Sequence, residues 1–406
     1  MKIAIPKELC ACEKRVATAP DTVKKLIALG AEVIIETKAG EKASFTDDAY
    51  KEAGAKIAKT TKDLYSKADI VFCVRSPEED QLKNIKKGTV LIGMLAPYDA
   101  PEMIKKYASI GIEAFSMELV PRITRAQSMD VLSSQSNLAG YKAVLDAADQ
   151  YGSAFPLMMT AAGTVPPAKV FVMGAGVAGL QAIATAKRLG AVVSATDVRP
   201  VAKEQVESLG GSFVMVESEE TKEAETSGGY AKEMSKDYQK KQAKLVAETI
   251  AKQDVVITTA LIPGRPAPLL ITKEMVKTMK PGSVIVDLAA ERGGNCELTE
   301  LDKVVEAHGV KIVGYKNFPA RIAADASSLY ARNLLNFLTP LVNKESGKLA
   351  IDWDDEIIKG CGLTHNGKIV HEGFGVKKKA PAKKTTVKKK AAPKKTATKK
   401  KKEASA

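Results

Sequence analysis

One stretch, from Lys169 to Asp197, restricts the possible folds of this 406-residue chain more than any other. It opens with a short apolar run at residues 170–173, which is typical of a strand buried in a parallel sheet. Three glycines in G-x-G-x-x-G spacing follow, namely Gly174, Gly176 and Gly179. Such glycines permit a tight turn, close approach of the backbone to a pyrophosphate, and close packing of helix on strand. The stretch therefore predicts a dinucleotide-binding βαβ unit.

The residues after the glycines strengthen this prediction. A helical segment ends at Gly190, and a second apolar run leads to Asp197, 18 residues after Gly179. This is near the spacing at which an acid bonds the adenosine ribose hydroxyls. The phosphates are expected at the N-terminus of the helix, where free N–H groups and the helix dipole favour negative charge.

The alternation of short apolar runs and helical segments predicts an α/β fold: two Rossmann-like doubly wound parallel-sheet domains with a cleft between them. We expect an N-terminal α/β domain over 1–136, completed by about 322–376, and an NAD-binding domain over 137–321. Strands are expected at 2–5, 32–36, 70–74, 90–93, 111–114, 170–173, 192–195, 213–216, 255–258, 284–287 and 311–313. Long helices are expected at 137–151, capped by Ser136 or Asn137, and at 322–339.

The charge is unevenly distributed along the chain. The net charge is +14, but 14 lysines and one glutamate lie in residues 377–406, so the rest of the chain is close to neutral. This tail lacks the apolar residues that a packed core needs, so we expect it to be disordered. It has no aromatic residue for stacking on bases, so no specific nucleic acid is expected as a partner. Two roles for this tail stay open. It could contact an anionic membrane or an acidic partner, or it could keep the protein in solution and bind nucleic acid only incidentally.

The five cysteines are few, odd in number and scattered, and no zinc-type pair of C-x-x-C elements is present. We therefore expect reduced thiols, no metal site and a cytoplasmic protein. The N-terminus has no apolar signal core. Residues 155–186 contain a single charge, but prolines and glycines interrupt them, so no membrane-spanning segment is expected.

A polar segment over residues 121–136 lies between two apolar elements and brings Arg122, Arg125, Gln127 and Asp130 close together. Its length exceeds that of an ordinary connection, and long loops of this kind are often functional.

Taken together, several motifs resemble the NAD(H)-binding alpha component of proton-translocating NAD(P) transhydrogenases, a family that shares its fold with alanine dehydrogenase. The resemblance covers about residues 1–375. It is carried by KIAIPKE, RVATAP, PRITRAQSMDVLSSQSNLAGY, TAAGTVPPAKVFVMGAGVAGL, TDVRP, GGYAKEMS, TTALIPGRPAP, KPGSVIVDLAAERGGNCELT and NFPARIAADAS. The loop RITRAQSMDVLSSQSN is far more specific than the glycine spacing.

The resemblance implies how NAD(H) is held. The residues that would orient the nicotinamide end and act in catalysis are Arg122, Gln127 and Asp130. Further cofactor contacts are implied at Ser128, Met129, Ser133, Gly174, Ala175, Gly176, Val177, Gly179, Asp197, Val198, Arg199, Gly229, Tyr230, Gln242 and Leu261. The segment around Gly229 and Tyr230 matches a loop that closes over the nucleotide. Arg199 could bind a 2′-phosphate, but Asp197 would repel it, so NAD is favoured over NADP.

The resemblance also implies the reaction and the partners. It implies an enzyme, an NAD(P)+ transhydrogenase of the Si-specific/Re-specific proton-translocating type, which transfers hydride from NADH to NADP on a partner subunit. A separate membrane-spanning subunit would carry the protons, and an NADP-binding beta subunit would hold NADP(H). A homodimer, peripheral on the cytoplasmic face of the inner or plasma membrane through its partner subunits, is implied as well. Hydride transfer between two nicotinamides needs no general acid or base at this site.

The alternative is an alanine dehydrogenase-like, NAD-dependent amino-acid oxidoreductase. That family uses a Lys, where this chain has Arg75, and a His, where it has Met94, together with an Arg that matches Arg15. Methionine cannot shuttle a proton, so the sequence favours the transhydrogenase, with a structural role for Arg15. The chain's three histidines, His308, His365 and His371, are predicted to lie outside the site.

Overall fold

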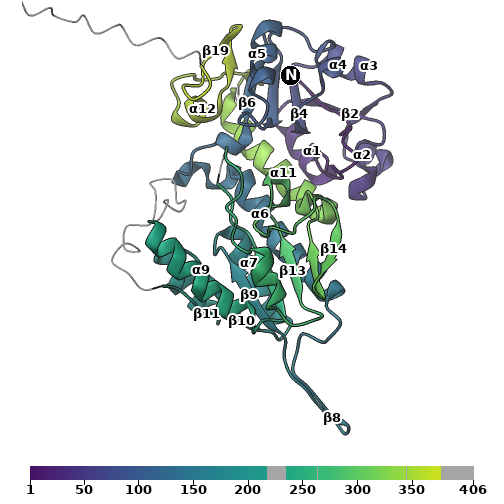
Figure 1. Cartoon of the computed structure of the whole chain (residues 1–406). Coiled ribbons are helices and arrows are strands. Elements are labelled where there is room, and N and C mark those ends of the chain that lie inside the picture. Colours follow the sequence, from purple (N-terminus) through teal and green to yellow (C-terminus); the bar gives the residue numbers. More distant parts are fainter. Residues whose placement is uncertain (217–234, 263, 344, 376–406) are drawn as a thin grey trace, which may run out of the picture. The chain divides into compact units, whose positions relative to one another are not determined.

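The computed structural model describes residues 1–216, 235–262, 264–343 and 345–375 and contains two large β-sheets with helices packed on them (Figure 1). The predicted α/β class with Rossmann-like parallel sheets is confirmed. The Lys-rich tail, 377–406, and the segment containing Gly229 and Tyr230 lie outside the described residues.

The first sheet has six parallel strands in the order β3-β2-β1-β4-β5-β6. They are β1 (Lys2–Ile5), β2 (Glu32–Glu36), β3 (Lys56–Ala58), β4 (Ile70–Arg75), β5 (Val90–Met94) and β6 (Glu113–Ser116). Ile3 and Ile5 enter one hydrophobic core and Ala4 enters another, because successive side chains point to opposite faces. Both faces are therefore covered, which explains why these strands are nearly continuous apolar runs.

The second sheet has seven strands in the order β11-β10-β9-β12-β13-β15-β14. They are β9 (Lys169–Met173), β10 (Val192–Thr196), β11 (Ser212–Phe213), β12 (Val255–Thr258), β13 (Val284–Asp287), β14 (Val304–Ala307) and β15 (Val310–Val313). Only β14 pairs antiparallel among these strands. The chain order reverses between β9 and β12, and ligands of such sheets bind at the carboxyl ends of the strands at this point.

The helices cover these sheets. They are α1 (Pro20–Ala28), α2 (Asp47–Glu52), α3 (Thr61–Ser66), α4 (Glu79–Leu82), α5 (Pro101–Ile110), α6 (Val131–Gln150), α7 (Val177–Arg188), α8 (Val201–Ser208), α9 (Lys236–Ile250), α10 (Lys273–Lys277), α11 (Ala323–Leu338) and α12 (Glu356–Cys361). Short strand pairs complete the described chain, β7 (Met158–Thr160) with β8 (Gly163–Val165), β16 (Val342–Asn343) with β17 (Lys348–Leu349), and β18 (Thr364–His365) with β19 (Lys368–Ile369).

The predicted start of the long helix was wrong. Helix α6 begins at Val131, not after Ser136 or Asn137, because the Asp130 carboxylate accepts the backbone N–H of Ser133 at 2.9 Å and caps the helix. Residues 131–136, which were expected to belong to the polar loop, form the first turns of the helix instead.

Helices α6 and α11 lie side by side and connect the two halves of the described chain. Val131, at the start of α6, belongs to the core of the first sheet, whereas Ala143, further along, belongs to the core of the second. Tyr330 and Leu334 of α11 pack again with the first sheet. The expected return of the chain toward its first sheet is thus built by α11.

Two features of the structure differ from expectation. The thiols of Cys10 and Cys12 form a disulfide, so the prediction of reduced thiols is wrong for this pair. Only Ala11 separates them, which places their Cα atoms 5.3 Å apart, within the range that a disulfide bridges. The β7–β8 hairpin was not predicted, because its apolar residues lie in the same uncharged stretch as the glycine motif. Figure 1 shows it extending away from the second sheet.

Candidate dinucleotide site

The three glycines after β9 occupy positions with different requirements. Gly174 has φ +100°, and a side chain there would meet the Thr259 hydroxyl at 2.5 Å. A β-carbon on Gly179 would lie 1.8 Å from the Gly174 carbonyl oxygen, so helix and turn approach too closely for any other residue. A β-carbon on Gly176 would meet nothing within 4 Å. The fold itself therefore requires Gly174 and Gly179, whereas Gly176 leaves open space in front of the backbone at the start of α7.

Asp197 follows β10 and is fixed beside the glycine turn. Its carboxylate accepts the backbone N–H of Ala175 at 2.8 Å. The Arg199 guanidinium donates to both carboxylate oxygens, from Nε at 2.9 Å and from Nη2 at 2.8 Å, and the Arg199 backbone N–H donates as well. Asp197 is 8% exposed, and Val198 and Arg199 are half-buried. The acid thus holds the turn in place and lies where the sequence spacing predicts it.

The predicted nicotinamide loop is a short helical turn, η3 (Thr124–Met129), followed by the cap of α6. The side chains of Gln127 and Ser128 are exposed, as is that of Arg122, whereas Met129 packs into the core of the first sheet. Met129 can therefore contact a ligand through its backbone only, not through its side chain.

Hydrogen bonds hold the C-terminal end of the loop. Asn333 and Asn336 of α11 donate their side-chain N–H groups to the Ser128 carbonyl at 2.8 and 3.1 Å. Asp130 accepts the Ser133 hydroxyl at 2.6 Å in addition to its capping bond, so these two predicted cofactor-contacting residues also bond each other. The loop is thus held in place with the side chains of Gln127 and Ser128 at its surface.

Helices α6 and α7 connect the nicotinamide loop to the glycine turn. A β-carbon on Gly140 would lie 2.0 Å from the Ala178 carbonyl oxygen, so α6 touches the first turn of α7. Asn137 donates to Gln181 at 3.2 Å across the same contact. Gly140 comes ten residues after Asp130, about 15 Å further along the axis of α6. The helix therefore fixes the separation between the nicotinamide loop and the glycine turn.

The loop after β12 packs beside Gly174. Thr259 donates its hydroxyl to the Gly174 carbonyl at 3.0 Å, and Leu261, two residues on, is 46% exposed. Asn295 fixes this loop, because its side chain accepts the Ala260 N–H at 3.0 Å and donates to the Ala260 carbonyl at 2.9 Å. Thr259 and Asn295 were not predicted from the sequence. The only signal for Thr259 was its place directly after a buried strand, and the only signal for Asn295 was its place directly after a pair of glycines. Gln242 is half-buried on α9, and its predicted contact stays a prediction.

The positions that correspond to an amino-acid oxidoreductase site are occupied by a buried ion network. Glu13 accepts Arg15 through both carboxylate oxygens at 2.7 Å, and Arg15 also donates to Gln135 at 2.8 Å. Arg75 donates to Glu13 at 3.0 Å. Burial alone would raise the pKa of Glu13, but Arg15, Asn317 and Arg75 lower it to about 2. Arg15 is saturated by protein groups, which agrees with its predicted structural role.

None of the three histidines contacts the residues of the predicted site. His365 bonds Glu113 at 2.5 Å and stacks on Trp353, and His371 contacts the Gly360 carbonyl at 3.1 Å. His308 lies in the turn between β14 and β15 with φ +55°. Met94, at the position of the alternative family's histidine, is half-buried on β5. The described residues around the glycine turn and the nicotinamide loop thus contain no imidazole.

Fold and geometry together define a Rossmann-like nucleotide-binding protein with a glycine turn, a neighbouring acid and a polar loop joined by one helix. Two family descriptions match the chain, "Alanine dehydrogenase/PNT, N-terminal domain" over residues 4–139 and "Alanine dehydrogenase/PNT, C-terminal domain" over residues 143–372. The chain belongs to the alanine dehydrogenase/PNT family.

Known proteins place it within this family. It is 59% identical over 376 residues to the first of the chains that make up the NAD(P) transhydrogenase subunit alpha of Rhodospirillum rubrum, covering 91% of this chain and 98% of that protein. It is 30% identical over 384 residues to "Alanine dehydrogenase 1" of Staphylococcus aureus, covering 92% and 96%. The crystal structure of a transhydrogenase from Sinorhizobium meliloti matches with a TM-score of 0.83 and 55% identity, covering 91% of this chain and 100% of that one. The predicted resemblance is confirmed.

Among the helices of the described residues, none is both long enough and apolar enough to cross a membrane.

Proposed function

We propose that this chain is the NAD(H)-binding subunit of a proton-translocating NAD(P) transhydrogenase of the Si-specific/Re-specific type. In this proposal hydride passes from NADH on this chain to NADP on a partner subunit, and a separate membrane subunit translocates protons. One observation carries the proposal: α6 links the glycine turn and the Arg-Gln-Asp loop at a fixed separation, while the neighbouring Arg15 is saturated by Glu13 and Gln135. Arg15, which matches the substrate-contacting arginine of the alternative family, is thus bound by protein groups instead of being left for a substrate carboxylate.

The open space at Gly176 supports the fit of the dinucleotide. The backbone of Gly176 and Val177 at the start of α7 would bind the pyrophosphate, and Asp197 the adenosine ribose. Bound NAD(H) supplies the hydride at its nicotinamide ring. The exposed Gln127 amide would pair with the carboxamide, and Arg122 would orient the ring or a group of the partner with its planar donors.

The partners and location follow from the same proposal. A membrane-spanning transhydrogenase subunit and an NADP-binding beta subunit would complete the enzyme. This chain would then be peripheral on the cytoplasmic face of the inner or plasma membrane. The relative from Rhodospirillum rubrum, whose name marks it as one portion of an alpha subunit, supports this division among several chains.

The first test measures nucleotide binding and substrate use by the purified chain. NADH should bind at least about tenfold more tightly than NADPH, because Asp197 accepts ribose hydroxyls and repels a 2′-phosphate, and charged hydrogen bonds contribute about 1.5–3 kcal/mol. An Asp197→Asn variant should lose most of this discrimination, because it keeps an acceptor for Ala175 but loses the charge. Fluorescence titration with NADH and with NADPH measures the two dissociation constants of each protein.

Two outcomes contradict the proposal. Equal binding of NADH and NADPH by the parent chain would remove the role given to Asp197. NADH formation from NAD and alanine would favour the alternative, an alanine dehydrogenase-like enzyme.

A homodimer is included in the proposal, and the β7–β8 hairpin is its candidate contact. Met159, in the middle of β7, is 81% exposed and lies next to the exposed Leu157 and Met158. A projecting two-stranded ribbon with apolar side chains is marginally stable in water and needs a cover. A second copy of this chain provides one in the proposed homodimer.

A Met159→Asp variant is therefore expected to shift the dimer toward monomer, because a buried, unpaired carboxylate costs several kcal/mol at an interface. Sedimentation velocity on the full chain measures the change. The matched control is Leu301→Asp, which alters a residue 51% exposed in a turn before β14 and should leave the dimer intact. A monomeric parent chain would contradict the homodimer, and a dimeric Met159→Asp variant would exclude the hairpin as its contact.

A further inference from the structure

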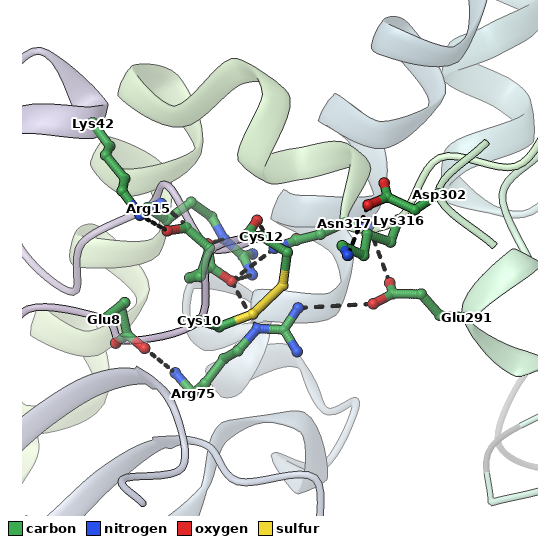
Figure 2. Close-up of a disulfide and its surroundings, with 11 residues drawn as sticks. Glu8, Cys10, Cys12, Arg15, Lys42, Arg75, Glu291, Asp302, Lys316 and Asn317 are labelled. Carbon is green, nitrogen blue, oxygen red and sulfur yellow. Dashed lines mark hydrogen bonds and ion pairs between the residues drawn. A yellow bond between two sulfur atoms is a disulfide. The ribbon is translucent and has the colours of Figure 1, made fainter. Parts of the chain in front are cut away.

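The Cys10–Cys12 disulfide lies in the segment between β1 and α1 (Figure 2). Cys10 is exposed and Cys12 is half-buried, so a small thiol can reach the bond. The ring that it closes contains one intervening residue, and so short a loop removes little conformational entropy from the unfolded chain. The disulfide therefore contributes little to the free energy of unfolding, and the chain is expected to fold in both redox states.

The other three cysteines cannot compete for the same chemistry. Cys73, Cys296 and Cys361 are all buried. Burial raises the pKa of Cys73 well above its usual value, that of Cys296 to about 11, and that of Cys361 as well. Because the thiolate is the reactive form, these three stay inert at neutral pH. Thiol chemistry of the folded chain is confined to residues 10 and 12.

The backbone of the disulfide-bonded segment is hydrogen-bonded to Asn317, in the segment that follows the second sheet. The Cys12 carbonyl accepts the side-chain N–H of Asn317 at 3.0 Å, and the Cys10 carbonyl accepts the Glu13 N–H at 2.9 Å. Asn317 also donates to the Glu13 carboxylate at 2.9 Å, and its backbone N–H donates to Glu291 at 3.1 Å. Figure 2 shows Arg75 and Asn317 beside the disulfide. Residues 10–12 are thus in direct hydrogen-bond contact with Asn317, which is distant in sequence.

A second route leads from the disulfide to the proposed nicotinamide loop. Glu13 binds Arg15, and Arg15 donates to Gln135 on α6 at 2.8 Å. Gln135 lies five residues after Asp130, which caps the same helix. The side chains of Glu13 and Arg15 therefore connect the disulfide-bonded segment to Gln135 on α6.

We propose that Cys10 and Cys12 form a thiol–disulfide exchange site for low-molecular-weight thiols of the glutathione class, and that its redox state alters the affinity for NAD(H). The second half of this proposal rests on the proposed function above. The first half does not, because exchange at the disulfide requires no nucleotide.

The exchange is balanced as a two-electron step. A small thiolate attacks Sγ of Cys10, the S–S bond breaks, and Cys12 leaves as a thiolate that takes up a proton. A second small thiolate attacks the small-molecule sulfur of the mixed disulfide and releases Cys10, which is also protonated. The two small thiols are oxidised to their disulfide and the protein bond is reduced to a dithiol. The reverse reaction, driven by the small disulfide, closes the bond again.

The redox titration tests the first half. The full chain is equilibrated in buffers of reduced and oxidised glutathione at neutral pH, alkylated at the same pH without denaturant, and digested for mass spectrometry. We expect Cys10 and Cys12 to change together between bonded and alkylated forms, with Cys73, Cys296 and Cys361 unlabelled in the native chain. A pair that stays reduced, or stays bonded, at every glutathione ratio overturns the exchange site.

NADH titration of the oxidised and reduced chain tests the second half. We expect the two dissociation constants to differ by about fivefold, the equilibrium effect of weakening one hydrogen bond of the network. The matched control, the double variant Cys10→Ser with Cys12→Ser, should bind NADH identically with and without reductant. Equal affinity of the oxidised and reduced parent chain overturns the coupling. A chain that exchanges its disulfide but binds NADH in neither form upholds the exchange site and contradicts the proposed function.

Discussion

A Gly176→Ala variant is expected to fold as stably as the parent chain and to bind NADH about fivefold to 150-fold more weakly, because inserting one methyl group into a tight contact costs about 1–3 kcal/mol. The added β-carbon meets no protein atom within 4 Å, and the φ of −78° at Gly176 suits any residue. The methyl group would instead occupy the space through which the pyrophosphate approaches the backbone. Thermal unfolding and NADH titration measure the two properties separately.

Two other glycines serve as matched controls for this variant. Gly179→Ala should lower stability as well as binding, because its β-carbon would lie 1.8 Å from the Gly174 carbonyl oxygen. Gly152→Ala should change neither, because this glycine is exposed with nothing near its β-carbon and lies away from the site. If Gly176→Ala binds NADH like the parent chain, the pyrophosphate does not lie at this turn.

Sequence alone predicted the elements whose signal is local. Strands β9, β10, β12 and β13 were recognised because both faces of a parallel sheet are buried, so each strand is an apolar run. Strand β14 was missed because it pairs antiparallel at the edge, where its side chains alternate between exposed and half-buried. The glycine turn and Asp197 were recognised by spacing, which follows from the length of one strand–helix–strand unit.

The features that could not be predicted from the sequence depend on contacts that form only in the folded chain. The capping role of Asp130 was overlooked because polar residues in a first helical turn resemble a loop. Arg15 and Gln135 are 120 positions apart, and only the folded chain shows that one saturates the other. The disulfide was not expected from two cysteines in a chain judged cytoplasmic, because bond formation depends on the local backbone and on the redox environment.

The buried ion network provides the second large expected effect. A Glu13→Ala variant should be destabilised by about 3–5 kcal/mol, because removing one partner leaves a buried charge uncompensated. Arg15 is 4% exposed, and Glu13 is its bidentate partner. The control is Glu32→Ala, which removes an exposed pair with Lys56 at 3.2 Å and should cost about 0–1 kcal/mol. Chemical denaturation at neutral pH measures both.

The pH dependence separates the charge of Glu13 from its packing. The pKa of Glu13 is lowered from about 4.5 to about 2 in the folded chain. Its stabilising charge is therefore fully present above about pH 4.5 and is lost as the pH falls toward 2, on the order of 3 kcal/mol in total. The difference in unfolding free energy between the parent chain and Glu13→Ala should shrink across this interval. Burial raises the pKa of the neighbouring Glu8 to about 8. The protonated form of Glu8 therefore contributes to the unfolding free energy below about pH 4.5, and this contribution is lost as the pH rises toward 8. A difference that stays constant between pH 5 and pH 2 would mean that Glu13 acts through packing alone.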